Sequence, residues 1–223
     1  MVKKIVGTGV LLVLALALQA GVKMYTLKSP DGKVKLEVTA GQGIAYSLFY
    51  DGRLLLKPSR IALHTDLPEA DHWENIRITG TKQRHVSETV QAPFYRVKEF
   101  GIDCNELELR LNNGFSLLMR AYNDGMAYRF VAGRKGEMTV VEERAEFNFA
   151  DDFEAYIPYS TNPKDPWNMA FQNFYTKAPL TQYNTELPAF LPLTVDAGAV
   201  KLTLLESDLE AYPGMFVCGD GKT

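Results

Sequence analysis

Apolar and polar residues alternate with a period of two along most of the chain beyond its first twenty residues. The segments KVKLEV at 33–38, NELELRL at 105–111 and VKLTLLE at 200–206 show the pattern. Successive side chains of a β-strand point to opposite faces, so this period predicts half-buried strands. At least ten such segments follow one another at short intervals. Strands in such close succession predict an antiparallel sandwich rather than alternating strands and helices.

Two stretches carry the signature of a tight β-hairpin. In AYNDGMAYRF at 121–130, the triplet Asn-Asp-Gly separates two alternating runs. In IAYSLFYDGRLLL at 44–56, Asp51 and Gly52 separate two more. Gly adopts a positive φ freely, and Asn or Asp tolerates it at little cost. Both stretches therefore predict two strands joined by a short turn.

Length and composition allow one large β domain or two small ones. The 223 residues are 46% hydrophobic and 11% aromatic, which is enough apolar material for a sizeable core. Helical periodicity is weak everywhere. Only ESDLEAY at 206–212 predicts a short turn of helix, with Ser207 or Asp208 as its cap. We therefore expect an all-β, antiparallel sandwich.

The first twenty residues are typical of a secretory signal peptide. MVKK is a short basic start, IVGTGVLLVLALAL is apolar, and Ala15, Ala17 and Ala20 are small residues suited to cleavage. The apolar run is shorter than the roughly 20 residues that span a membrane. The pattern predicts removal of residues 1–20, a mature domain over 21–223 without a membrane anchor, and a periplasmic or secreted location.

Charge and catalytic motifs exclude several classes of function. The net charge of −3 comes without a basic stripe, which argues against nucleic acid as a partner. His64, His72 and His85 lack the spacing of a zinc site. The chain has no G-x-S-x-G, P-loop or G-x-G-x-x-G motif. The residues by themselves predict no catalytic constellation.

The position of Cys104 just before the strand at 105–111 predicts its exposure. Cys104 shares the polar face of that strand with Glu106, Glu108 and Arg110. We therefore expect Cys104 to lie outside the core and the two glutamates to be solvated. Cys104 and Cys218 would occupy a compartment that permits disulfides, and either a bond between them or two free thiols is consistent with the sequence.

Residues 157–190 form an irregular stretch rich in proline and aromatic residues. Loops of this length are uncommon unless they serve a function. Flat aromatic rings stack on the C–H faces of sugars, so one interpretation is a carbohydrate surface. The alternative is that the rings pin the loop onto the sandwich. The rings concerned are Trp167, Phe171, Phe174, Tyr175 and Tyr183.

Three motifs resemble those of one enzyme family. SPDGKVKLEV at 29–38 resembles the start of the N-terminal domain of glycoside hydrolase family 97. FSLLMRAYNDGMAYRF at 115–130 is similar to the central hairpin of that domain. LPLTV followed by LTLLESDLEAYPGMF at 202–216 is similar to its closing signature. The resemblance covers nearly the whole mature chain, with the motifs in the family's order.

The resemblance implies a large antiparallel β-super-sandwich that precedes a (β/α)₈ catalytic barrel. Family members are exported, calcium-dependent α-glucosidases or α-galactosidases, and their catalytic carboxylates lie on the barrel. The N-terminal domain packs on the barrel and lends a loop and a calcium-binding carboxylate. By position in the motif that carboxylate is Glu206, with Glu186 of YNTELP as the weaker alternative.

The sequence reaches only to VCGDGKT, where a family barrel would begin. A fragment, a truncated gene product and a free-standing module are all consistent with this. We expect either the accessory domain of a family 97 α-glycosidase or a stand-alone carbohydrate-binding sandwich. The first would take an α-linked oligosaccharide together with its barrel, share calcium with it, and be inactive alone.

Overall fold

The computed structural model describes residues 22–223 except 161, 163, 166, 168–172 and 211. The predicted signal peptide at 1–20 and the predicted sugar-binding residue Phe171 therefore lie outside the described residues. The chain divides into two compact units, of which the first ends at Phe147 and the second covers Asn148–Thr223. The prediction of one domain over 21–223 stays a prediction. No described helix is long and apolar enough to cross a membrane.

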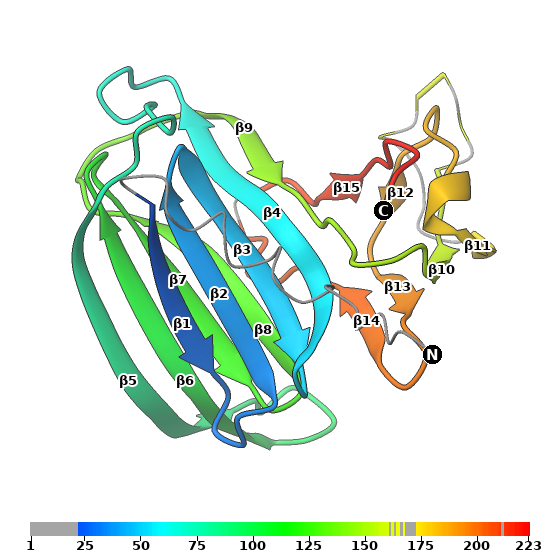
Figure 1. The fold of residues 1–223 in the computed structure, drawn as a ribbon, viewed down its shortest axis with the longest axis horizontal. Coiled ribbons are helices and arrows are strands. Elements are labelled where there is room, and N and C mark those ends of the chain that lie inside the picture. Colours follow the sequence, from blue (N-terminus) through cyan, green and yellow to red (C-terminus); the bar gives the residue numbers. More distant parts are fainter. Residues whose placement is uncertain (1–21, 161, 163, 166, 168–172, 211) are drawn as a thin grey trace, which may run out of the picture. The chain divides into compact units, whose positions relative to one another are not determined.

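The first unit consists of two antiparallel sheets (Figure 1). The five-stranded sheet has the order β1-β2-β3-β4-β9, and the four-stranded sheet has the order β5-β6-β7-β8. The strands are β1 (Lys23–Lys28), β2 (Val34–Gly41), β3 (Gly43–Tyr50), β4 (Arg53–Thr65), β5 (Ile78–Gln91), β6 (Glu99–Leu111), β7 (Phe115–Tyr122), β8 (Gly125–Ala132) and β9 (Val140–Ala145). The predicted all-β, antiparallel fold is confirmed.

The core of this unit lies between the two sheets. Along β2, buried and half-buried residues alternate without a break, as the period of two predicts. The inward side chains of both sheets are almost completely excluded from water: Leu36, Val38, Ile44 and Tyr46 from one sheet, and Leu107, Leu109, Leu117 and Met119 from the other, each at most 1% exposed. Burial on this scale is the main force that holds the sheets together.

Both predicted hairpins are present. Asp51 and Gly52 join β3 to β4 with φ of 48° and 79°, the positive values that a two-residue hairpin of matching twist requires. In the second hairpin the two turn residues are Asn123 and Asp124, because Gly125 already pairs with Tyr122 as the first residue of β8. Gly125 is outside the left-handed region, so this glycine does not supply the positive φ that the motif suggested.

The second unit is built from shorter strands. One sheet has the order β11-β10-β13-β14, and β12 pairs with β15. The elements are β10 (Glu154–Ile157), β11 (Thr176–Pro179), the 3₁₀ turn η1 (Leu180–Gln182), β12 (Ala189–Phe190), β13 (Leu193–Asp196), β14 (Lys201–Leu204) and β15 (Phe216–Val217).

The helical turn predicted over 206–212 is wrong. The described residues of this segment are irregular, and Asp208 takes a φ of 65°. Leu209, which would provide the apolar side of such a helix, is 44% exposed. A short helix needs a buried face to be stable, and this segment offers none.

Candidate functional site

The second unit contains the segment in which we predicted sugar-binding aromatic residues. Tyr183 follows η1 and is 8% exposed, and its hydroxyl donates a hydrogen bond to the carbonyl of Val217 at 2.8 Å. Its ring meets that of Tyr159 edge-on, with centroids 5.0 Å apart. An added Cβ at Gly219 would come within 2.4 Å of the Tyr183 ring. This placement suits an anchor of the loop, and the role of Tyr183 in sugar binding stays a prediction.

Other rings of the same segment reach the surface. Trp167 is 61% exposed, and its ring meets Phe216 edge-on at 5.1 Å. Phe174 is 95% exposed and Tyr175 is 46% exposed. These three side chains have ring faces available to a ligand. Their assignment to substrate, like that of Phe171, stays a prediction.

Tyr159 organises the loop, and the sequence reasoning missed it. The Asn173 side-chain amide donates to the Tyr159 carbonyl at 2.7 Å. The backbone N–H of Asn184 donates to the Tyr159 hydroxyl, also at 2.7 Å. Burial raises the pKa of Tyr159, which keeps its hydroxyl neutral at physiological pH. The sequence did contain a signal for it: the alternation of strand β10, which ends at Ile157, continues for one more step to Tyr159.

The two glutamates predicted as calcium ligands occupy different environments. One carboxylate oxygen of Glu206 accepts the backbone N–H of Met215 at 2.6 Å, which closes the segment between them into a loop. Glu186 is exposed, and its backbone N–H donates to the Asn184 side chain at 3.1 Å. Among the described residues, no hydrogen bond or ion pair involves the Glu186 carboxylate. Glu206 therefore has a local structural role that Glu186 lacks.

Metal-binding side chains do not cluster within the part of the chain that the structure describes. There, no group of three or more His, Cys, Asp or Glu side chains converges as a metal site would require. Calcium takes 6–8 oxygen ligands at about 2.3–2.6 Å. The role of Glu206 or Glu186 as a calcium ligand stays a prediction.

In the first unit, the prediction that Glu106 is solvated is wrong. The Glu106 side chain is 6% exposed and lies between two arginines that face it from the neighbouring strands. Nε of Arg84 donates to one carboxylate oxygen at 2.6 Å, and Nε of Arg120 donates to the other at 2.8 Å. Burial raises the pKa of Glu106, but the two arginines outweigh burial and hold this pKa below its usual range.

Cys104 lies on the same face of β6, and it is also buried, contrary to our prediction. It is 0% exposed, and burial raises the pKa of its thiol. Cys104 and Cys218 are both free thiols, and Cys218 is exposed. Glu108, two residues beyond Glu106, is half-buried and lies 3.7 Å from Arg110. This face of β6 is therefore buried at Cys104 and Glu106 and becomes exposed toward Phe100 at one end and Arg110 at the other.

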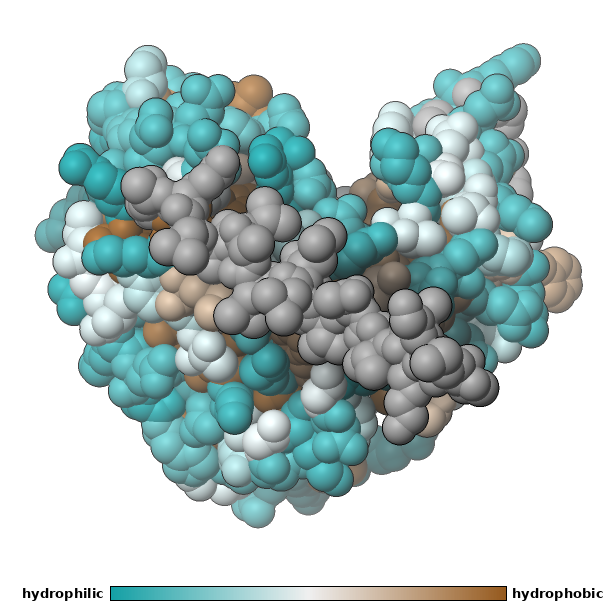
Figure 2. Space-filling view, in the orientation of Figure 1, coloured by the Kyte–Doolittle hydropathy of each residue, from teal (hydrophilic) through white to brown (hydrophobic). Residues whose placement is uncertain are grey.

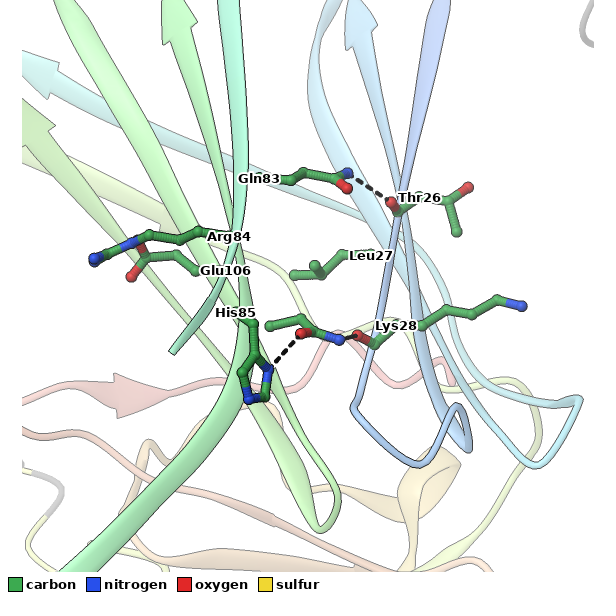
Figure 3. A pocket seen from close by; sticks show the side chains of 8 residues that line it. Thr26, Leu27, Lys28, Gln83, Arg84, His85 and Glu106 are labelled. Atoms are coloured by element: carbon green, nitrogen blue, oxygen red, sulfur yellow. Dashed lines mark hydrogen bonds and ion pairs between the residues drawn. The ribbon is translucent and has the colours of Figure 1, made fainter. Parts of the chain in front are cut away.

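A shallow pocket lies where β1 approaches β5 and β6 (Figure 3). The Gln83 amide donates to the Thr26 carbonyl at 3.2 Å, and the Asn105 amide donates to the Lys28 carbonyl at 2.8 Å. In Figure 3, Gln83 and Leu27 point into the space between the strands, whereas Arg84 and Glu106 point away from it. The two amides that line the pocket already donate to backbone carbonyls of β1, and they attach β1 to the second sheet. They are therefore not available to a ligand.

Known proteins resemble this chain over most of its length. The sequence profile of the family described as Glycosyl-hydrolase 97 N-terminal matches residues 27–223. A Retaining alpha-galactosidase of Bacteroides thetaiotaomicron is 41% identical over 209 residues, which are 91% of this chain and 31% of that protein. A Probable retaining alpha-galactosidase of Streptomyces bingchenggensis is 26% identical over 158 residues, 69% of this chain and 24% of that protein.

Solved structures agree on the fold. A Glycoside Hydrolase Family 97 enzyme in complex with acarbose, from Pseudoalteromonas sp. strain K8, superposes with a TM-score of 0.62 at 19% identity. The superposition covers 77% of this chain and 26% of that one. A beta-arabinopyranosidase superposes with a TM-score of 0.63 at 22% identity, over 77% of this chain and 31% of its own.

Fold and profile together define a β-sandwich domain of the kind found in glycoside hydrolases. More particularly, the chain belongs to the family of glycoside hydrolase 97 N-terminal domains, as its motifs indicated. The chain spans about a third or less of the length of the curated relatives that it matches.

Proposed function

We propose that this chain is the N-terminal accessory domain of an exported, calcium-dependent α-glycosidase, and that it packs on a (β/α)₈ barrel and completes the substrate and calcium site. The observation that carries the proposal is the family match over 27–223, combined with relatives whose aligned part is 31% and 24% of their length. A catalytic barrel needs about 250 residues, which fits easily into the remaining length of such relatives.

The substrate proposal follows from the same relatives. Both curated relatives are described as retaining alpha-galactosidases or probable ones. We therefore propose an α-linked oligosaccharide, with an α-galactoside as the first substrate to test and an α-glucoside as the second. Trp167, Phe174 and Tyr175 provide exposed rings that would extend the binding surface outward from the barrel.

Activity tests the accessory role. The purified chain after signal cleavage should not hydrolyse aryl α-galactosides or aryl α-glucosides, whereas the whole enzyme with its barrel should. Turnover by the chain alone that survives repurification would overturn the proposal. Binding of α-linked oligosaccharides by the chain alone, without any barrel in its gene, would instead favour the stand-alone carbohydrate-binding module. N-terminal sequencing of the exported protein tests cleavage near Ala20.

Calcium binding tests the two glutamates. The chain alone should bind Ca²⁺ only in the millimolar range or weaker, so added calcium should leave its melting temperature unchanged. In the whole enzyme, Glu206→Gln should weaken calcium binding and lower activity, as measured by calorimetry and turnover. Glu186→Gln is the matched comparison, because the two residues differ in local contacts.

The outcomes separate a ligand from a loop-closing residue. If Glu206 serves only to hold Met215, Glu206→Gln will lower stability slightly and leave calcium affinity unchanged. Loss of affinity in Glu186→Gln alone would assign the ligand to Glu186. Unchanged affinity in both variants would remove the calcium part of the proposal and leave the accessory role in place.

A further inference from the structure

The hairpin of β5 and β6 extends beyond the sheet to which it belongs. β5 and β6 pair from Ile78 and Leu111 as far as Gln91 and Glu99. β7, by contrast, pairs with β6 only over Cys104–Arg110. Residues 87–103 therefore form a two-stranded ribbon with no neighbouring strand on either side, and we call this ribbon the arm. Its strands are the long outer pair of the second sheet in Figure 1.

The arm lacks the burial that stabilises the rest of the unit. Val86, just before the arm, is 6% exposed, but every residue from 87 to 103 is exposed except the half-buried Ala92 and Ile102. An isolated two-stranded hairpin is marginally stable in water, because it has no second layer to cover it. The arm is thus long for a ribbon in which nearly every side chain is exposed.

Large apolar side chains gather at the end of the arm. Phe94 is 103% exposed, Tyr95 67% and Val97 49%. Val90 and Phe100, on the strands just behind them, are 42% and 40% exposed. Figure 2 shows a mostly hydrophilic face with scattered hydrophobic residues. Other large apolar side chains of the described chain, such as Met24 and Phe174, are exposed too, but the five named here belong to one hairpin. Soluble proteins rarely expose large contiguous apolar patches, and those that occur commonly mark interaction sites.

The end of the arm is ordered by its own contacts. The N–H of Ala92 donates to the Lys98 carbonyl at 2.7 Å, and the N–H of Tyr95 donates to the Ala92 carbonyl at 3.0 Å. The rings of Tyr95 and Phe100 lie 5.7 Å apart. A preformed loop loses little conformational freedom on binding, so the exposed rings are presented at low entropic cost.

We infer that the arm docks into the catalytic part of the same enzyme, with Phe94 and Tyr95 inserted in an apolar pocket. The inference rests on the proposed function, which supplies a second body on the same polypeptide. The relatives' aligned share of 31% and 24% leaves room for such a body.

A sugar is a poorer occupant than a protein surface. A sugar ring stacks on one face of an aromatic ring, whereas the arm is bare on both faces over the strand segments 87–91 and 99–103. Only a concave macromolecular surface covers a ribbon from both sides.

Photo-crosslinking in the whole, active enzyme tests the contact directly. Phe94 is replaced by the photoreactive amino acid p-benzoylphenylalanine, and the crosslinked peptides are mapped by mass spectrometry. The expected result is a crosslink within one molecule to a residue beyond 223. Met24, 62% exposed on β1, is the matched control position and should give no such peptide at comparable yield.

A double variant measures how much the contact protects the arm from hydrogen exchange. Phe94→Ser with Tyr95→Ser should increase hydrogen exchange of the arm amides in the whole enzyme by about tenfold or more, because burial of one large apolar side chain is worth at least that factor. Met24→Ser should leave exchange in the arm unchanged. In the chain of 223 residues alone, the arm should exchange rapidly with or without the substitutions.

The outcomes also distinguish the inference from the proposed function. An active whole enzyme with no crosslink from Phe94 to its barrel overturns the inference and leaves the accessory role standing. Crosslinks between two molecules assign the arm to a second copy of the chain, which also overturns it. A gene that encodes no barrel overturns the proposed function, and the arm's partner with it.

Discussion

The two units of this chain differ in how much of their structure consists of long, regular strands. In the first unit, long strands bring alternating apolar residues from two sheets into one core, with side chains such as Leu109 and Leu117 at 0% exposure. The second unit has a core of its own, with Ile157 and Val195 at 0% exposure, but its strands are only two to four residues long and hydrogen bonds between side chains and backbone also tie its segments. Tyr183 to Val217 and Glu206 to Met215 are examples.

This difference bears on function. A regular core is insensitive to the identity of any one loop, so the sandwich is a stable platform. The second unit instead holds irregular segments in defined conformations by individual polar contacts, and it carries the exposed rings of Trp167, Phe174 and Tyr175 and both candidate calcium ligands. Substitutions of single polar residues should therefore lower the stability of the second unit, whereas the stability of the sandwich should depend chiefly on its core residues.

The largest effect should come from the core of the sandwich. Leu117→Ala removes a fully buried side chain that packs between the two sheets. We expect a loss of about 3 kcal/mol in the free energy of unfolding, because the lost transfer energy is joined by the cost of a cavity. Urea denaturation followed by circular dichroism measures it. A loss below about 1 kcal/mol would show that the core can collapse around the gap.

Glu106→Gln should follow, with a distinctive dependence on pH. The variant keeps the side-chain volume but directs an amide N–H₂ group or a weaker acceptor at Arg84 and Arg120. We expect the free energy of unfolding to fall by about 2 kcal/mol at neutral pH. The arginines partly reach solvent, which limits the loss.

The sign of the pH effect follows from the lowered pKa of Glu106. The unfolded chain binds this proton more readily than the folded one, so the contribution of the carboxylate is fully present above the unfolded pKa of about 4.3. It is lost as the pH falls below that value and through the folded pKa. Denaturation series between neutral and acid pH should therefore show the wild type and Glu106→Gln converging; a constant difference would contradict the assignment.

The smallest of these effects compares two tyrosine hydroxyls. Tyr183→Phe removes the 2.8 Å hydrogen bond to the Val217 carbonyl in the second unit. We expect the free energy of unfolding to fall by about 1 kcal/mol. Tyr46→Phe is the matched control in the sandwich, since its hydroxyl lies 3.5 Å from the Glu146 carbonyl, too far for a strong bond. Equal losses in thermal unfolding would show that the two units do not differ in the way described.

The sequence by itself determined the fold class, because a period of two is a local property that each strand carries independently. It also determined the hairpin at Asp51 and Gly52, where positive φ selects the residue types, and the family, through motifs in a fixed order. Where the local signal was weak, as for the helical turn at 206–212, the prediction failed.

Only the tertiary structure decided the environment of individual side chains. Glu106 and Cys104 occupy alternate positions on a strand face that looks polar, yet strand pairing places Arg84 and Arg120 across from Glu106, and both residues are buried. The exposure of Phe94 likewise depends on how far β7 extends along β6. Such facts depend on the pairing of segments distant in sequence, and alternation within one segment carries no information about its neighbours.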